Sequence, residues 1–173
     1  ELNLKEGIEW RWLETGDKLT TADESTVVVK LSGCGEITLG ADSAVEITKM
    51  DLAGKKGKGR ASVHHQRGRL QAVVGQPRKK GAAGRCQLGV RVGQSTIMGT
   101  RCDVETSYLE DGRYRAWVAA GTARLEHETG LMALLGSGVI VDDGPPVTIT
   151  GDPSNEFPLS LTQPGSVVYA LSP

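Results

Sequence analysis

Basic side chains form the most prominent group of residues that could carry chemistry in this 173-residue chain. Between Leu52 and Cys102 there are twelve lysines and arginines and no acidic residue. Half of them fall in two glycine-rich segments, 51–59 (DLAGKKGKG) and 76–84 (QPRKKGAAG), whose composition predicts exposed loops. Lysines and arginines in such loops could neutralise phosphate, sulfate or carboxylate groups. The candidate partner- or anion-binding residues are Lys55, Lys56, Lys58, Arg60, Arg78, Lys79, Lys80 and Arg85.

The net charge of −1 hides this segregation of charge along the chain. Outside 52–102, eight basic residues stand against all 21 acidic ones, a balance of −13. The asymmetry indicates either an anionic partner or self-complementary packing. The alternative is a pair of solvated loops whose charge is offset by acidic neighbours in space. Because the loops lack interleaved aromatic residues and no duplex-reading helix is predicted, we expect no sequence-specific binding of nucleic acid.

The histidines and the clustered acidic residues do not have the spacing of a metal site. His64 and His65 are adjacent, so on a strand their side chains point to opposite faces, and we interpret them as surface residues of an exposed strand. His127 has no carboxylate partner at a recognisable spacing. No metal and no cofactor are therefore expected. The acidic residues towards the C-terminus match no calcium-binding loop and are interpreted as solvated turns: Asp142, Asp143, Asp152 and Glu156.

No motif in the chain indicates catalysis. There is no Gly-x-Ser-x-Gly sequence, and Ser137 lies between two glycines in a predicted turn. Residues 54–59 (GKKGKG) lack the spacing of a phosphate-binding loop and a following helix. Nothing in the sequence selects a pair of carboxylates for acid–base chemistry. We therefore predict no catalytic residue and no enzymatic activity.

The three cysteines, Cys34, Cys86 and Cys102, are an odd number without CxxC spacing, so a structural zinc site is not expected. One interpretation is that all three are buried free thiols. The other applies in an oxidising compartment, where Cys86 and Cys102 are the better disulfide candidates because they sit in neighbouring predicted strands.

Alternating apolar and polar residues, separated by glycine-containing turns, indicate short strands that would position these side chains. Asp111-Gly112 is the best hairpin turn. Residues 131–135 could form a strand or a helical turn. We expect an all-β fold with little helix, in which short antiparallel and solenoid-like strands form a β-roll or a sandwich. The predicted strands are 26–31, 36–39, 44–47, 60–64, 69–74, 87–92, 95–98, 101–106, 114–119, 122–127, 131–135, 138–141, 147–149, 159–161 and 167–171.

The character of the sequence changes after Asp143. We predict a β domain over 1–143 and a C-terminal extension over 144–173, which completes the sheet or docks on a neighbouring copy. No apolar run is long enough to cross a membrane, and no signal-peptide pattern is present, so any leader or anchor is expected to have been removed or to lie outside this sequence.

The order of several short phrases resembles the FecR domain family of bacterial cell-envelope proteins. Residues 16–21 (GDKLTT) resemble the opening phrase of the family, and 38–43 (TLGADS) its Leu-x-Leu-Gly-x-x-Ser phrase. Residues 98–100 (MGT) and then Cys102 stand where the family has Gly-Thr followed by an aromatic residue. The resemblance spans roughly 11–143. The two basic loops, Cys102 and the tail beyond Asp143 depart from the pattern.

This resemblance implies a non-enzymatic β domain, periplasmic or at the cell surface, that mediates protein–protein interaction or signalling. Signalling members relay the state of an outer-membrane receptor to a cytoplasmic sigma factor, and this chain shows neither the membrane-spanning nor the cytoplasmic segment of such a relay. The first alternative is a structural subunit of a surface assembly or filament, held by charge complementarity and strand addition. The second is binding of a polyanion or glycan by the basic loops. The expected partners are an envelope protein, a second copy, or an anionic polymer such as lipopolysaccharide.

Overall fold

The computed structural model describes residues 7–52, 59–75, 86–130, 132–142, 147–148 and 166–171. Within these residues there is no helix, and strands account for most of the chain, which confirms the prediction of an all-β fold. The strands are β1 (Gly7–Trp12), β2 (Lys18–Thr20), β3 (Val27–Leu31), β4 (Gly35–Leu39), β5 (Ala44–Asp51), β6 (Arg60–Arg67), β7 (Arg69–Val74), β8 (Gln87–Val92), β9 (Ser95–Tyr108), β10 (Tyr114–His127), β11 (Met132–Gly136), β12 (Val139–Asp142), β13 (Val147–Thr148) and β14 (Ser166–Leu171).

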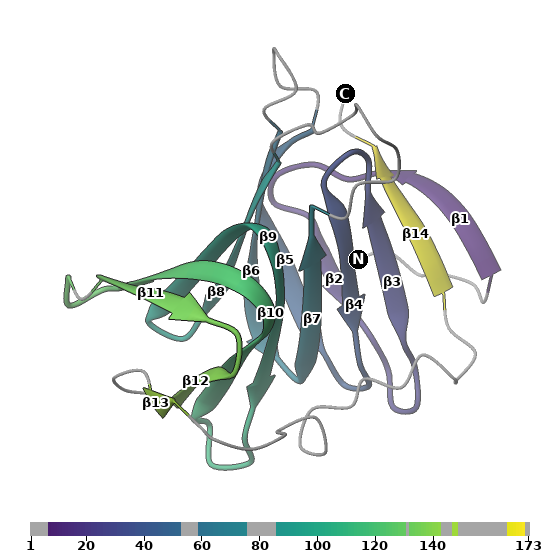
Figure 1. Cartoon of the computed structure of the whole chain (residues 1–173). Helices are drawn as coiled ribbons and strands as arrows, with labels where there is room; N and C mark the ends of the chain where they lie inside the picture. The colour runs from purple at the N-terminus through teal and green to yellow at the C-terminus, as the bar shows by residue number, and fades with distance from the viewer. Residues whose placement is uncertain are drawn as a thin grey trace.

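All of these strands belong to one sheet, which curls so that its two halves face each other (Figure 1). The sheet bends along the long strand β9, which takes part in both halves. One of its edges pairs with β10, while the other pairs first with β8 through 95–99 and then with β7 through 102–107. The front half thus continues through β7, β4, β3, β14 and β1, and the rear half continues through β8, β6, β5 and β2.

The hydrophobic core lies between the two halves, because each strand buries every second residue. In the front half, Val29, Ile37, Ala72, Val104 and Val118 are cross-strand neighbours and all point inward. The rear half contributes a matching row of buried residues: Ile47, Val63, Val90, Ile97 and Leu125.

Two glycine-threonine pairs, Gly99-Thr100 on β9 and Gly121-Thr122 on β10, mark the place where these strands pass from one half to the other. Along β9 the buried positions change phase at Thr100 and Arg101, which are both exposed. On β10 the register with β9 shifts between Val118 and Ala120 and again between Thr122 and Arg124. Gly121 lies between these shifts with φ +80°, where a side chain would collide with the carbonyl oxygen of Arg101. A glycine is therefore required at this bend. Each long strand had been expected as two shorter ones, and the bend explains why.

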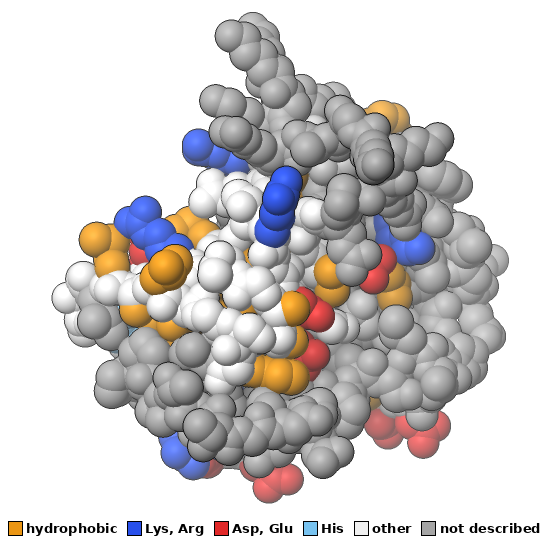
Figure 2. Space-filling view, in the orientation of Figure 1, with side chains coloured by type: hydrophobic (Ala, Val, Ile, Leu, Met, Phe, Trp, Pro, Cys, Tyr) orange, Lys and Arg blue, Asp and Glu red, His pale blue; other side chains and the backbone are white. Residues whose placement is uncertain are grey.

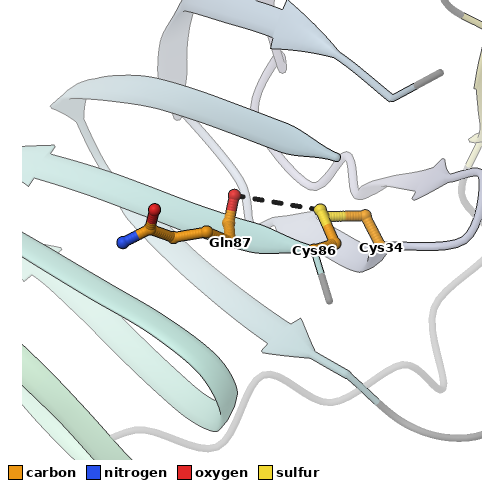
Figure 3. The surroundings of a disulfide bond; sticks show 3 residues. All are labelled: Cys34, Cys86 and Gln87. Carbon is orange, nitrogen blue, oxygen red and sulfur yellow. Dashed lines mark hydrogen bonds between the residues drawn. A yellow bond between two sulfur atoms is a disulfide. The ribbon is translucent and has the colours of Figure 1, made fainter. Parts of the chain in front are cut away.

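A disulfide bond joins Cys34 to Cys86, with the two Cα atoms 4.9 Å apart (Figure 3). It links the turn between β3 and β4, in the front half, to the residue just before β8, in the rear half. The expected Cys86–Cys102 pairing is wrong, and so is the interpretation of all three cysteines as free thiols. By Cys102, β9 has left β8 and pairs with β7, where Cys102 is opposite Val74. Cys102 is buried and free, and its sulfur packs against Gly99.

The structure also decides the predictions for residues 131–135 and for His65. Residues 132–136 form β11 and not a helical turn. His65 is fully buried, so its interpretation as a surface residue is wrong; β6 is covered on that face by the front half. The predicted strand at 159–161 lies outside the described residues.

The C-terminal strand β14 lies between β1 and β3 and runs parallel to both (Figure 1). The last strand of the chain is therefore inserted into the front half of the sheet. The division into a domain of 1–143 and an extension of 144–173 stays a prediction.

Candidate functional site

The predicted basic site lies mostly outside the described residues. Of its eight members only Arg60 is described, as the exposed first residue of β6. The others, Lys55, Lys56, Lys58, Arg78, Lys79, Lys80 and Arg85, fall in 53–58 and 76–85. The described residues that follow these two segments are neighbours, because β6 and β8 pair in parallel with Arg60 opposite Gln87, and the backbone N–H of Gln87 donates to the Gly59 carbonyl at 3.0 Å. Each segment is therefore followed in the sequence by one of two paired strands, and Cys86 stands just before the second of these strands.

A buried polar network around His65 joins the two halves of the sheet. Thr106 of β9 lies 2.8 Å from His65 Nδ1, and the Arg67 carbonyl oxygen lies 2.8 Å from Nε2. Since a carbonyl only accepts, Nε2 carries the proton and the Thr106 hydroxyl donates to Nδ1. Burial lowers the pKa of His65 to about 4, so the ring is neutral near pH 7. Both ring nitrogens have partners within the core, and this arrangement indicates a structural role.

The outer face of the front half carries a row of polar residues that are buried or half-buried. Thr38, Gln71, Glu105 and Trp117 are successive cross-strand neighbours on β4, β7, β9 and β10. They lie on the face opposite the core, yet Thr38, Glu105 and Trp117 are all buried. Figure 2 shows acidic side chains beside hydrophobic ones near the centre of this face, over the strands seen there in Figure 1. We call Gln71, Asp103, Glu105 and Trp117 the carboxylate cluster.

Two carboxylates of the carboxylate cluster share one amide. Gln71 Nε2 lies 3.1 Å from each carboxylate oxygen of Asp103 and 3.3 Å from Glu105 Oε1. Glu105 is only 7% exposed, and its Oε2 atom has no hydrogen-bond partner among the described residues. Asp103 and Glu105 are two residues apart on β9, so they project to the same side of the sheet.

The environment of these carboxylates favours their neutral forms. Burial first, and then the negative charge of Asp103, raise the pKa of Glu105 to about 7, while the positive charge of Arg69 opposes the rise. Burial also raises the pKa of Asp103, the Gln71 hydrogen bond lowers it, and the charge of Glu36 raises it. Near neutral pH the carboxylate cluster is therefore partly protonated, and a positively charged group would favour its ionised form.

A second unusual surface lies at the edge strand β11. Among the described strands it pairs only with β10, so one edge of its backbone has no strand beside it. Its sequence MALLG has no charged residue, and Met132 and Leu134 are 63% and 79% exposed. Figure 2 shows hydrophobic side chains beside basic ones where Figure 1 places β11. Uncharged, exposed edge strands are templates for the addition of another strand.

In the part of the chain that the structure describes, no three His, Cys, Asp or Glu side chains gather closely enough to hold a metal ion. No helix within those same ranges is long and apolar enough to span a membrane.

A comparison with known protein families identifies the family of this chain. Residues 17–124, which run from the turn before β2 into β10 and contain the whole carboxylate cluster, match the FecR protein family. The chain belongs to the FecR family. The match covers more than half of the chain, and it confirms the resemblance seen in the sequence.

Two crystal structures of a "putative anti-sigma factor" from Parabacteroides distasonis ATCC 8503 share the fold of this FecR-family chain. The structure at 1.65 Å resolution has a TM-score of 0.55 and 14% sequence identity, and that at 2.50 Å has 0.56 and 15%. Each match covers 80% of this chain and 61% of the other, so this chain spans about three fifths of the length of those proteins. At such low identity the likeness shows the fold alone. No curated protein matches the chain.

Neither the carboxylate cluster nor the β11 edge had been singled out from the sequence. A signal for the first was present, since Asp103 and Glu105 alternate with apolar residues in CDVET and so share one face of a predicted strand. Their burial on the outer face depends on the neighbouring strands β7 and β10, which the sequence pattern did not identify. The signal for the second was a strand without lysine, proline or charge.

Proposed function

We propose that this FecR-family domain is a non-enzymatic protein-recognition module of the cell envelope, periplasmic or at the cell surface, that acts in signalling. Family membership over 17–124 supports a regulatory role. The family match covers residues 17–124, and the proposed role is that of the whole protein.

The observation that carries the proposal is the edge of β11 that pairs with none of the described strands. A partner strand that pairs with β11 would gain backbone hydrogen bonds, while Met132 and Leu134 would lose their exposure to water. Strand addition of this kind needs a rigid sheet behind the edge. The pairing of β10 with both β9 and β11 provides it.

The proposal is tested by photo-crosslinking in the source cells. A photoreactive phenylalanine analogue at position 134 is expected to give a discrete adduct, and the same analogue at the exposed hairpin residue Glu110 is expected to give none. Met132→Lys, which places a charge on the edge, should abolish the adduct. An adduct with an envelope protein supports recognition of a partner, and one at twice the chain's mass favours the structural-subunit alternative. Equal labelling from positions 134 and 110 would contradict the proposal.

A second candidate function, binding of a polyanion, is favoured by the hydrogen bond between Gly59 and Gln87, which lie just after the two stretches of basic sequence, 53–58 and 76–85. Replacing Lys55, Lys56, Lys79 and Lys80 together by glutamine is expected to lower the salt concentration that elutes the domain from a heparin column. The physical reason is that fewer counterions are released when fewer cations contact the polymer. As a control, Lys18, Lys30, Lys49 and Arg113, which lie outside the basic segments, are replaced by glutamine. Equal elution of both variants would exclude this candidate.

A further inference from the structure

The carboxylate cluster has more hydrogen-bond acceptors than donors. Asp103 and Glu105 present four carboxylate oxygens, and Gln71 offers two N–H groups that are shared among three of them. The fourth oxygen, Glu105 Oε2, is buried without a partner among the described residues. An unmatched buried acceptor is costly, so its presence in a folded protein calls for an explanation.

The charged groups around the carboxylate cluster leave it short of positive charge. On β9 Asp103 lies beside Glu105, and on β4 Glu36 acts on Asp103. On β7 the nearest cation is Arg69, whose charge opposes the rise in the Glu105 pKa without cancelling it. On β10 Arg115 lies one row further along the same face, opposite Ser107. A cation that entered beside Asp103 and Glu105 would therefore meet two acids at close range.

We propose that Asp103 and Glu105 bind the guanidinium group of an arginine side chain presented by a protein partner. The inference rests on the proposed function, since it names the chemistry that a partner of this domain would present. It concerns a surface separate from β11, on the outer face of the front half.

The guanidinium is the cation that fits these acceptors. It carries five N–H donors in a planar fork and stays charged at any physiological pH, whereas a lysine ammonium carries three donors at one point. Carboxylates two residues apart on one face of a strand can be bridged by such a fork. A metal ion is not the expected ligand, because no third metal-binding side chain lies close enough within the described residues.

Binding would redistribute the existing hydrogen bonds. Asp103 and Gln71 are only partly buried, so the incoming group would reach Asp103 first. With Asp103 bound to the guanidinium, the Gln71 amide would be left to Glu105 Oε1, and a guanidinium N–H would reach Glu105 Oε2. Trp117, which is opposite Glu105 in the register of β9 and β10, would report the change through its indole N–H.

The test is a titration of the ¹⁵N-labelled chain followed by NMR, with the capped tripeptide Ac-Val-Arg-Val-NH₂ as the probe. The chain has three tryptophans, and the spectrum of Trp117→Phe identifies the Trp117 indole signal. The peptide is expected to shift this signal, and Glu105→Gln is expected to weaken the binding about tenfold, the loss of one charge-assisted hydrogen bond. Between pH 6 and pH 8 the affinity should rise about tenfold, because Glu105 ionises near pH 7, and it should stay flat in Glu105→Gln.

The matched control replaces arginine by citrulline, which has the same shape without the charge. No shift with citrulline supports the inference, and an equal shift overturns it. A shift with free spermidine but none with the arginine peptide would also overturn it, since a free polyamine would then be the ligand. Asp103→Asn provides a second variant, expected to weaken the binding to a similar extent, should Glu105→Gln unfold. If the arginine peptide gives no shift while position 134 still crosslinks, the inference fails and the proposed function stands.

Discussion

Replacing Cys34 and Cys86 together by serine is expected to lower the free energy of unfolding by about 4 kcal/mol. The disulfide bond between these two cysteines closes a loop of 52 residues, and its removal returns conformational freedom to the unfolded chain. The chain-entropy relation gives ~4 kcal/mol for a loop of this length. A domain of this size is stabilised by roughly 5–15 kcal/mol in total. The loss would therefore remove a large part of its stability.

The measurement is urea unfolding with and without a reducing agent. The parent chain should lose stability on reduction, while the double serine variant should be unaffected by it. Cys102→Ala is the control, because Cys102 takes no part in the bond and should leave the effect of reduction unchanged. Burial raises the pKa of Cys102 to about 11, so exchange of this thiol with the bond is slow in the folded state. A parent chain that is indifferent to reduction would contradict the structure.

The strands themselves could be predicted from the sequence because their signal is local. In LQAVV and CDVETSY every second residue is apolar or faces the core, and the pattern does not depend on which strands are neighbours. The FecR phrases were equally local, since each occupies only a few residues around a turn such as that at Gly16 or Gly40. The all-β fold and the family could therefore both be read from the chain.

The features that depend on the curl of the sheet could not be predicted. Cys34 and Cys86 meet because the front and rear halves face each other, and nothing local to either residue indicates this. The burial of His65 has the same origin, since the residue that covers it, Thr106, lies 41 positions further along the chain. Glu105 looked like an ordinary surface acid of an alternating strand. The amide that it shares comes from Gln71 on β7, and its other cross-strand neighbour is Trp117 on β10.

Glu105 and His65 have the most strongly shifted pKa values among the described residues, and they have opposite effects on how stability depends on pH. The pKa of Glu105 is raised from 4.5 to about 7, so the folded state binds more protons than the unfolded state between these values, and stability falls as pH rises through that window. The pKa of His65 is lowered from 6.5 to about 4, so the unfolded state binds more protons there, and stability falls as pH drops. The opposite signs mean that the parent chain's pH profile cannot be assigned to either residue without a variant.

For His65 the expected result is a loss of about 3 kcal/mol of stability between pH 7 and pH 4, and the loss from this residue levels off as pH falls through its folded pKa of about 4. Protonation would place a charge in the core and would put a proton on Nδ1, which now accepts from the Thr106 hydroxyl. Burial is the main cause of the lowered pKa, and the neighbouring charge of His64 adds to it, while the Arg67 carbonyl favours the charged ring.

His65→Gln isolates this contribution, because glutamine can both donate and accept but does not titrate. At pH 7 the variant should be less stable than the parent, since its amide cannot match both contacts of the ring. As pH falls towards 4 the difference should shrink by about 3 kcal/mol, because only the parent loses the histidine contribution while Glu105 acts equally in both. The measurement is urea unfolding at half-unit steps from pH 7 to pH 4. A difference that stays constant over this range would mean that His65 titrates normally, and that the two halves of the sheet do not enclose it.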